Sequence, residues 1–97
     1  MTSAYQLTRI ADNDLSEIWR ESYEQWASRQ ADKYLNELES CFIELNQHPE
    51  LGQMRHEIRE GYRSIPKNKH LIFYRQHRGH IEIIRVLHQR MEINNYL

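Results

Sequence analysis

The first half of the chain carries apolar and aromatic residues at helical spacing. One stripe recurs at i, i+3, i+4, i+7, i+8 and i+11, which is the pattern of an amphipathic helix. Its members are Leu15, Ile18, Trp19, Ser22, Tyr23 and Trp26. Thr8 or Asp12 is the expected N-cap of this helix. Because the stripe is continuous, we expect Trp19 and Trp26 to join the core, although Trp26 lies close enough to the helix end to anchor a partner.

A second stripe of the same kind follows almost immediately. Its members are Ala31, Tyr34, Leu35, Leu38, Cys41, Phe42 and Leu45. We expect Ser28 to cap this helix and Pro49 to stop it. Two helices with so short a connection must form an antiparallel hairpin. A lone thiol on an apolar stripe is expected to be buried and inert.

The second half of the chain changes to strand patterns separated by turn residues. We predict strands at Tyr62–Ile65, ending at Pro66, at His70–Gln76 and at His80–Leu87. The last run is apolar on both parities, which predicts an interior strand. An alternating run around Leu7 predicts an opening strand.

The order β-α-α-β-β-β predicts an α+β domain in which an antiparallel sheet packs against the N-terminal helical hairpin. Residues 1–97 suffice for a single domain with one core. Little chain remains to cover the second sheet face, so we expect that face to be polar or to be covered by a partner. The tail Gln89–Leu97 is expected to add a short helix or to stay mobile.

The charge of the chain is divided unevenly along its length. Residues 1–50 hold four Lys/Arg and ten Asp/Glu, a net −6, whereas residues 51–97 hold nine and four, a net +5. A basic half favours an anionic partner, unless the two halves neutralise each other in the fold. No apolar run is long enough to span a membrane. A single cysteine and a start without signal-peptide features predict a reducing cytosol.

Six histidines prompt a search for a metal site, but none has zinc-ligand spacing, and we expect no metal and no cofactor. Basic residues in the strand region are more informative. They are Arg59, Arg63, Arg75, Arg85, His88 and Arg90. Metal-free RNA cleavage needs a proton acceptor, a proton donor and cations that hold phosphate. Arg63, Tyr74, Arg85 and His88 are the candidates for such a set.

The alternative for the same residues is structural, and we favour it. His88 then ends a strand with its ring hydrogen-bonded. The arginines pair with nearby glutamates, namely Glu57, Glu60, Glu82 and Glu92. Arg85 stands apart because a guanidinium within an apolar strand requires an anionic partner, internal or external.

Six strings along the chain resemble the ParE toxins of the RelE/ParE superfamily, the toxin halves of bacterial type II toxin–antitoxin systems. They are Asn13–Trp19, Gln30–Leu35, His48–Gly52, Ile58–Arg63, His70–Arg75 and Ile83–Met91. The resemblance runs in order over nearly the whole chain. One departure is Ala27, where the family commonly has glycine after the tryptophan. Alanine adopts a left-handed helix cap less readily than glycine, so this sequence predicts such a cap less strongly than the family pattern does.

The resemblance implies a toxin that traps DNA gyrase on cleaved DNA and has no catalytic residue of its own. RelE relatives share the fold but cut mRNA on the ribosome, which keeps the ribonuclease as the alternative. A third possibility is an inactive toxin that acts as a co-repressor. We expect the gyrase inhibitor, because the second and third predicted sheet strands lack lysine. A role in plasmid or prophage maintenance and a bacterial cytoplasmic location are also implied.

The resemblance further implies a cognate antitoxin that packs a helix on the helical hairpin and adds a strand to the sheet, giving a hetero-oligomer. Operator DNA is then reached only through the antitoxin, and no membrane is involved. The expected antitoxin contacts are Arg59, Arg63, Arg75, Arg85 and Trp26. The expected target contacts are His88, Arg90 and Met91.

Overall fold

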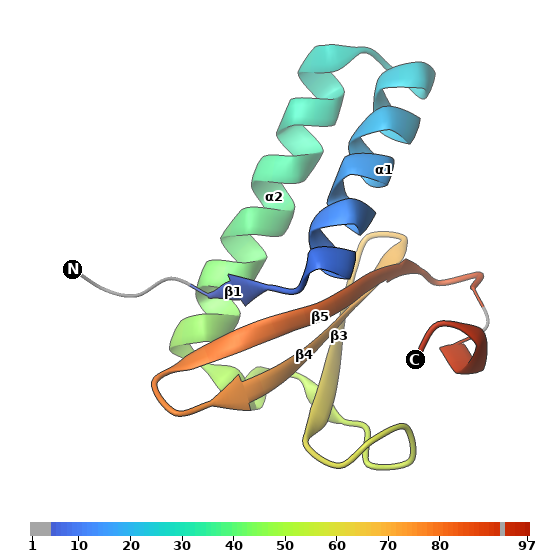
Figure 1. Cartoon of the computed structure of the whole chain (residues 1–97). Coiled ribbons are helices and arrows are strands. Elements are labelled where there is room, and N and C mark those ends of the chain that lie inside the picture. Colours follow the sequence, from blue (N-terminus) through green and yellow to red (C-terminus); the bar gives the residue numbers. More distant parts are fainter. Residues whose placement is uncertain (1–4, 92) are drawn as a thin grey trace.

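The structure, a computed structural model, describes residues 5–91 and 93–97. Two helices stand side by side against one face of a twisted sheet, and their connecting bend projects past the sheet (Figure 1). The elements are β1 (Gln6–Leu7), α1 (Arg9–Gln25), α2 (Ser28–Gln47), η1 (Pro49–Leu51), β2 (Gln53–Met54), β3 (Tyr62–Lys67), β4 (His70–His77), β5 (His80–His88) and η2 (Ile93–Asn95). The predicted α+β fold is therefore confirmed. Within the described ranges, no helix is both long and apolar enough to cross a membrane.

The sheet has the strand order β1-β5-β4-β3-β2. β1 lies parallel to β5, and the other neighbours are antiparallel. β5 has a neighbour on each side, as its apolar residues on both parities predicted. The sequence did not predict β2, whose two residues pair with Arg63 and Ser64 of β3.

Helix α1 begins at the cap that the sequence offered. The Thr8 hydroxyl oxygen accepts a hydrogen bond from the Ala11 amide at 2.9 Å. The same hydroxyl donates to the Ile84 carbonyl at 2.8 Å, and the Thr8 amide donates to the Ile83 carbonyl at 3.1 Å. Thr8 therefore caps α1 and joins its first turn to β5.

The predicted cap of α2 is wrong by one residue. Ser28 is the first helical residue, and Ala27 occupies the cap position with a φ of +125°. The Ala27 carbonyl accepts the first helical hydrogen bond, from the Ala31 amide at 3.0 Å. The chain reverses at this point, and the reversal needs a backbone conformation that glycine adopts far more readily than alanine.

β3 extends further than predicted, through Pro66 to Lys67. Pro66 pairs with Leu71 of β4, but β2 pairs with β3 only as far as Ser64. Pro66 therefore lies where β3 forms the edge of the sheet, and there the missing N–H interrupts no second ladder. A two-residue turn follows, in which Asn68 takes a φ of +54°. Of the two alternatives expected for the tail, the short helix is present, as η2.

The main core lies between the hairpin and the sheet. Its largest fully buried side chains include Tyr74, Phe42, Leu38, Leu45, Ile72, Ile81 and Ile83. The prediction that Trp26 belongs to the core is wrong, because its side chain is 56% exposed. Trp26 is the C-cap residue of α1, at the bend of the hairpin, and this bend projects past the sheet (Figure 1). Trp19 is half-buried.

The second sheet face is less open than we expected. Ser64, Phe73 and Arg85 are cross-strand partners on β3, β4 and β5, so their side chains share this face. Phe73 is nevertheless fully buried. The guanidinium of Arg55 lies over its ring at 5.6 Å. The chain therefore covers part of this face with its own residues.

Candidate partner-binding surfaces

Arginine side chains gather on the sheet face that the helices leave free. We call this surface the basic sheet face and define it by Arg55, Arg59, Tyr62, Arg75 and Arg85. Tyr62 and Arg75 are cross-strand partners, and the Arg59 guanidinium lies 5.9 Å from the centre of the Tyr62 ring. Arg59 and Arg75 are exposed, whereas Arg55 and Arg85 are only partly so. The exposed pair is available to an anionic partner.

The anion that Arg85 requires is supplied by the chain itself. Its Nε and Nη2 donate to the two carboxylate oxygens of Asp14 at 2.9 and 2.8 Å. The Val86 amide also donates to Asp14, at 3.0 Å. The hydrogen bonds to Asp14 raise the pKa of Arg85. The glutamates proposed from the sequence are not its partners among the described residues, and Glu92 lies outside them.

Arg63 and Tyr74 hold the turn between α2 and β2 against the sheet. The Tyr74 hydroxyl donates to the Pro49 carbonyl at 2.6 Å and accepts from the Gly52 amide at 2.7 Å. Arg63 Nη1 donates to the Gly52 carbonyl at 2.7 Å. Burial raises the pKa of Tyr74, whose side chain is fully buried. The contacts of Arg63 and Tyr74 with this turn therefore give both residues a structural role.

His88 packs edge-on against His70, with 5.3 Å between ring centroids. His70 is buried, and its Nδ1 lies 2.6 Å from the Tyr34 hydroxyl on α2. Burial, together with the neighbouring His88, lowers the pKa of His70 to about 4. His88 Nδ1 accepts a hydrogen bond from the Arg90 amide at 3.1 Å. The histidine pair thus lies where β5 ends and the tail begins.

The four residues of the ribonuclease alternative do not converge. Arg63 and Tyr74 are cross-strand partners that contact the 49–52 turn. Arg85 pairs with Phe73 and therefore faces the opposite side of the sheet. His88 lies at the far end of the β4–β5 ladder, opposite His70. These four residues therefore do not bring a proton donor, a proton acceptor and a phosphate-binding cation to one point.

The residues expected to bind partners fall into two groups. Trp26 is 56% exposed and Met91 is 41% exposed, and Arg90 is also exposed. With Arg59 and Arg75 they remain accessible, whereas Arg63 and Arg85 make internal contacts. The sequence did not indicate Arg55, which donates to Ser64 at 2.9 Å and to Glu57 at 2.7 Å. Its position depends on the pairing of β2 with β3, and the hydrophobic pattern of the sequence does not predict this pairing.

A partly apolar groove runs beside α1. It is lined by side chains from β1, α1 and α2, among them Tyr5, Leu7, Leu15, Trp19 and Leu35. Trp19 and Tyr23 stack with 5.1 Å between centroids, and the Trp19 Nε1 donates to Asp32 at 2.9 Å. The exposed Trp26 follows on the same stripe. The groove and this aromatic row form one surface along the hairpin.

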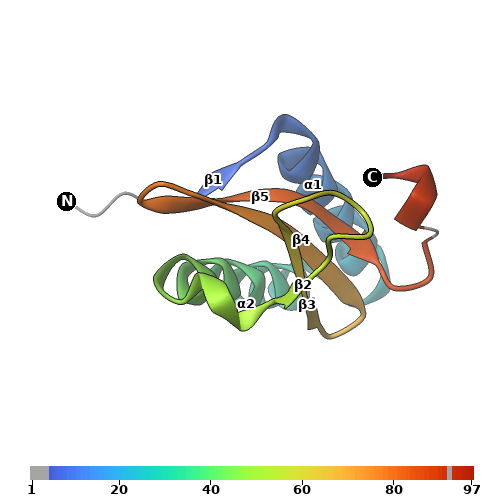
Figure 2. The ribbon, with the colours of Figure 1, turned by 90° about the horizontal axis from the view of Figure 1, so that it is seen from below.

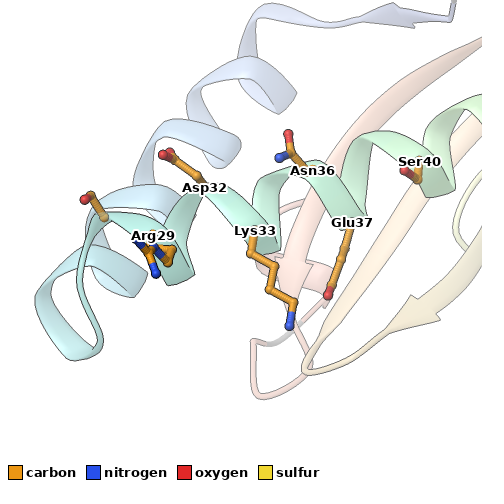
Figure 3. A pocket seen from close by; sticks show the side chains of 7 residues that line it. Arg29, Asp32, Lys33, Asn36, Glu37 and Ser40 are labelled. Atoms are coloured by element: carbon orange, nitrogen blue, oxygen red, sulfur yellow. The ribbon is translucent and has the colours of Figure 1, made fainter.

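α2 also carries a row of polar side chains between Ser28 and Ser40 (Figure 3). Figure 3 shows its side chains spread along the helix rather than directed at a common point; they are Arg29, Asp32, Lys33, Asn36, Glu37 and Ser40. Opposite charges occur at helical spacing here, in Arg29 with Asp32 and in Lys33 with Glu37. This surface is a solvated helix face, and it offers matched positions for control substitutions.

Comparison with known proteins gives consistent matches over the full chain. Residues 5–93 match the model of the family described as ParE toxin of type II toxin-antitoxin system, parDE. The chain is 40% identical over 98 positions to "Toxin ParE1" of Mycobacterium tuberculosis, with both chains covered completely. It is 40% identical to "Toxin ParE1" of Caulobacter vibrioides, with 96% of each chain covered. A solved structure titled "Chromosomal ParDE TA system from P. aeruginosa" superposes with a TM-score of 0.76 at 20% identity, covering 90% of this chain and 96% of that one, and supports the fold.

Proposed function

The chain belongs to the ParE toxin family of type II toxin–antitoxin systems, and on that premise we propose that it inhibits DNA gyrase and is neutralised by direct binding of a cognate antitoxin. The observation that carries this proposal is 40% identity to chains named as ParE toxins along the whole length. Such a toxin acts in the bacterial cytoplasm, where gyrase and replicating DNA are found.

The geometry of the sheet supports a binding mechanism over catalysis. RNA cleavage without a metal requires positioned groups that donate and accept protons beside the phosphate. Tyr74 and Arg63 are occupied by the 49–52 turn, and Arg85 is occupied by Asp14. A toxin that traps its target needs only a complementary surface, which the exposed side chains offer.

Two surfaces are suited to the antitoxin. The exposed guanidinium groups of Arg59 and Arg75 are complementary to carboxylates, which arginine binds in a bidentate manner. Trp26 and the groove beside α1 are suited to the apolar side of an amphipathic helix. An antitoxin that spans both surfaces would bury acidic and apolar side chains together, and the product would be a hetero-oligomer.

The start of the tail is the proposed contact with the target. Arg90 and Met91 are exposed directly after β5, and His88 is half-buried beside them. Aromatic residues, methionine and arginine are enriched at protein interfaces. These residues lie at the end of β5, whereas Trp26 is the C-cap residue of α1, at the bend of the helical hairpin that projects past the sheet (Figure 1).

The target is tested with purified toxin, DNA gyrase and relaxed plasmid. We expect inhibited supercoiling or accumulation of cleaved DNA, and intact mRNA in a parallel translation reaction. Arg90→Glu should weaken gyrase inhibition, whereas Arg29→Glu on the polar side of α2 should not. Cleaved mRNA together with uninhibited gyrase would overturn the proposal in favour of the ribonuclease.

The antitoxin surface is tested with the cognate antitoxin, which is to be sought as the product of a short reading frame adjacent to the gene. We expect the double substitution Arg59→Glu and Arg75→Glu to weaken binding by at least tenfold, because like charges would then face each other. The matched control reverses Arg29 and Lys33, two exposed cations of α2. Equal affinities for the two double variants would remove Arg59 and Arg75 from the interface.

A further inference from the structure

The C-terminal segment folds back onto the basic sheet face. η2 turns from the end of β5 toward the sheet (Figure 1, dark red), and Figure 2 shows it beside the end of β5. The Tyr96 ring lies 5.5 Å from the Arg85 guanidinium carbon. The Tyr96 carbonyl accepts a hydrogen bond from Arg85 Nη1 at 3.3 Å. Both contacts meet the same side chain.

Arg85 is bound firmly on one edge and weakly on the other. Asp14 takes the Nε and Nη2 edge with two hydrogen bonds shorter than 3.0 Å. The bond to the Tyr96 carbonyl is longer than the usual range for N–H···O bonds. The Tyr96 side chain is 42% exposed, and a cation–π contact at an exposed site is weak. The tail can therefore leave Arg85 while the pair with Asp14 stays intact.

We propose that Ile93–Leu97 is a strap that closes over the basic sheet face, that Arg85 is its clasp, and that a carboxylate of an acidic segment displaces it. The strap and its clasp belong to the free chain. Only the assignment of the acidic segment to the antitoxin rests on the proposed function.

The chemistry of the clasp favours this exchange. The strap presents a neutral ring and a neutral carbonyl to Arg85. A carboxylate on the Nη1 edge would make a charge-assisted bond, which is roughly twice as strong as a neutral one. Arg75 is exposed on the same face and offers the acidic segment a second cation. Closing the strap keeps the Nη1 edge of Arg85 occupied until such a segment arrives.

The strap is tested first without any partner, from the Nε–Hε resonance of Arg85 in a ¹⁵N-labelled chain. A ring held over the guanidinium shifts this proton upfield. We expect Tyr96→Ala to remove that shift and Tyr96→Phe, which keeps a ring, to retain it. An Arg85 resonance that is the same in Tyr96→Ala and the wild type would show that the strap does not close.

The displacement is tested with a synthetic oligoglutamate peptide as the carboxylate probe. Tyr96→Ala leaves the net charge unchanged, so a difference from the wild type reports the strap rather than general electrostatics. We expect this variant to bind the peptide roughly three- to tenfold more tightly. In the wild type, the molecules with a closed strap cannot bind the peptide, and the variant has no closed molecules. Tyr96→Phe should bind like the wild type. Equal or weaker binding by Tyr96→Ala would overturn the displacement, whereas failure to inhibit gyrase would affect only the proposed function.

Discussion

Asp14 on α1 and Arg85 on β5 form two parallel hydrogen bonds across a sequence separation of 71 residues. The side chains are 11% and 16% exposed, so the pair is largely withdrawn from water. Asp14 also accepts from the Val86 amide. One carboxylate thus satisfies both the charge in the strand and a backbone donor, and it fixes α1 to the sheet.

Removing the charge of Asp14 should destabilise the chain. Asp14→Asn leaves the Arg85 guanidinium without its anion and weakens its charged hydrogen bonds, and we expect the free energy of unfolding to fall by about 2 kcal/mol. Urea denaturation measures this difference. The control is Asp12→Asn, an exposed residue two positions earlier, for which about 0.5 kcal/mol is expected. Equal effects of the two substitutions would show that the Asp14–Arg85 pair contributes no more to stability than a surface ion pair.

Gly52 has no room for a side chain. A Cβ at this position would overlap the hydroxyl and ring of Tyr74, which itself is held by Pro49. We expect Gly52→Ala to lower the free energy of unfolding by about 1–3 kcal/mol. The measurement is a cycle with Tyr74→Phe, which removes the hydroxyl. The cost of Gly52→Ala should be smaller in that background, because the hydroxyl is the atom nearest to the new Cβ. An unchanged cost would show that the hydroxyl does not contribute to the clash.

Replacing Ala27 with glycine should stabilise the chain. Its φ of +125° with ψ of 168° lies in a region essentially restricted to glycine. We expect Ala27→Gly to raise the free energy of unfolding by about 1 kcal/mol and the melting temperature by about 4–8 °C. Calorimetry tests this. Ser28→Gly, at the first helical residue, is the control and should destabilise; a loss of stability in both variants would contradict the strain at Ala27.

Acid should weaken the fold through His70. Its pKa is about 4 in the folded chain, against 6.5 for an unperturbed histidine, so the unfolded chain binds a proton first as the pH falls. The stabilisation from keeping His70 neutral is therefore complete above pH 6.5 and is lost as the pH falls to about 4. The loss should approach about 3 kcal/mol. Urea denaturation across this range measures it.

The control for this pH dependence is a second histidine. His70→Gln should flatten the decline in stability, whereas His56→Gln, at an exposed position, should leave it unchanged. NMR titration of the His70 ring provides a direct check. A ring that titrates near pH 6.5 would show that burial does not hold it neutral.

Local patterns predicted both long helices and four of the five strands that the structure describes. Helical spacing located α1 and α2, and Thr8 was one of the two residues proposed for the first cap. Apolar residues on both parities identified β5 as an interior strand. These patterns succeed because the period of a helix or strand is a property of neighbouring residues, and one buried face imposes it. β2 escaped detection because two exposed residues carry no period.

The contacts of the candidate surfaces were decided by the tertiary structure. The sequence showed that Arg85 needs an anion, but only the packing of α1 on β5 brings Asp14 to it. The sequence made Tyr74 a candidate for catalysis, but in the structure its hydroxyl is hydrogen-bonded to the 49–52 turn. The sequence placed Trp26 on a buried stripe, but in the structure Trp26 lies at the hairpin bend and is exposed. The physical reason is common to all three: periodicity determines which face a side chain occupies, whereas the partner it meets there depends on how distant segments align.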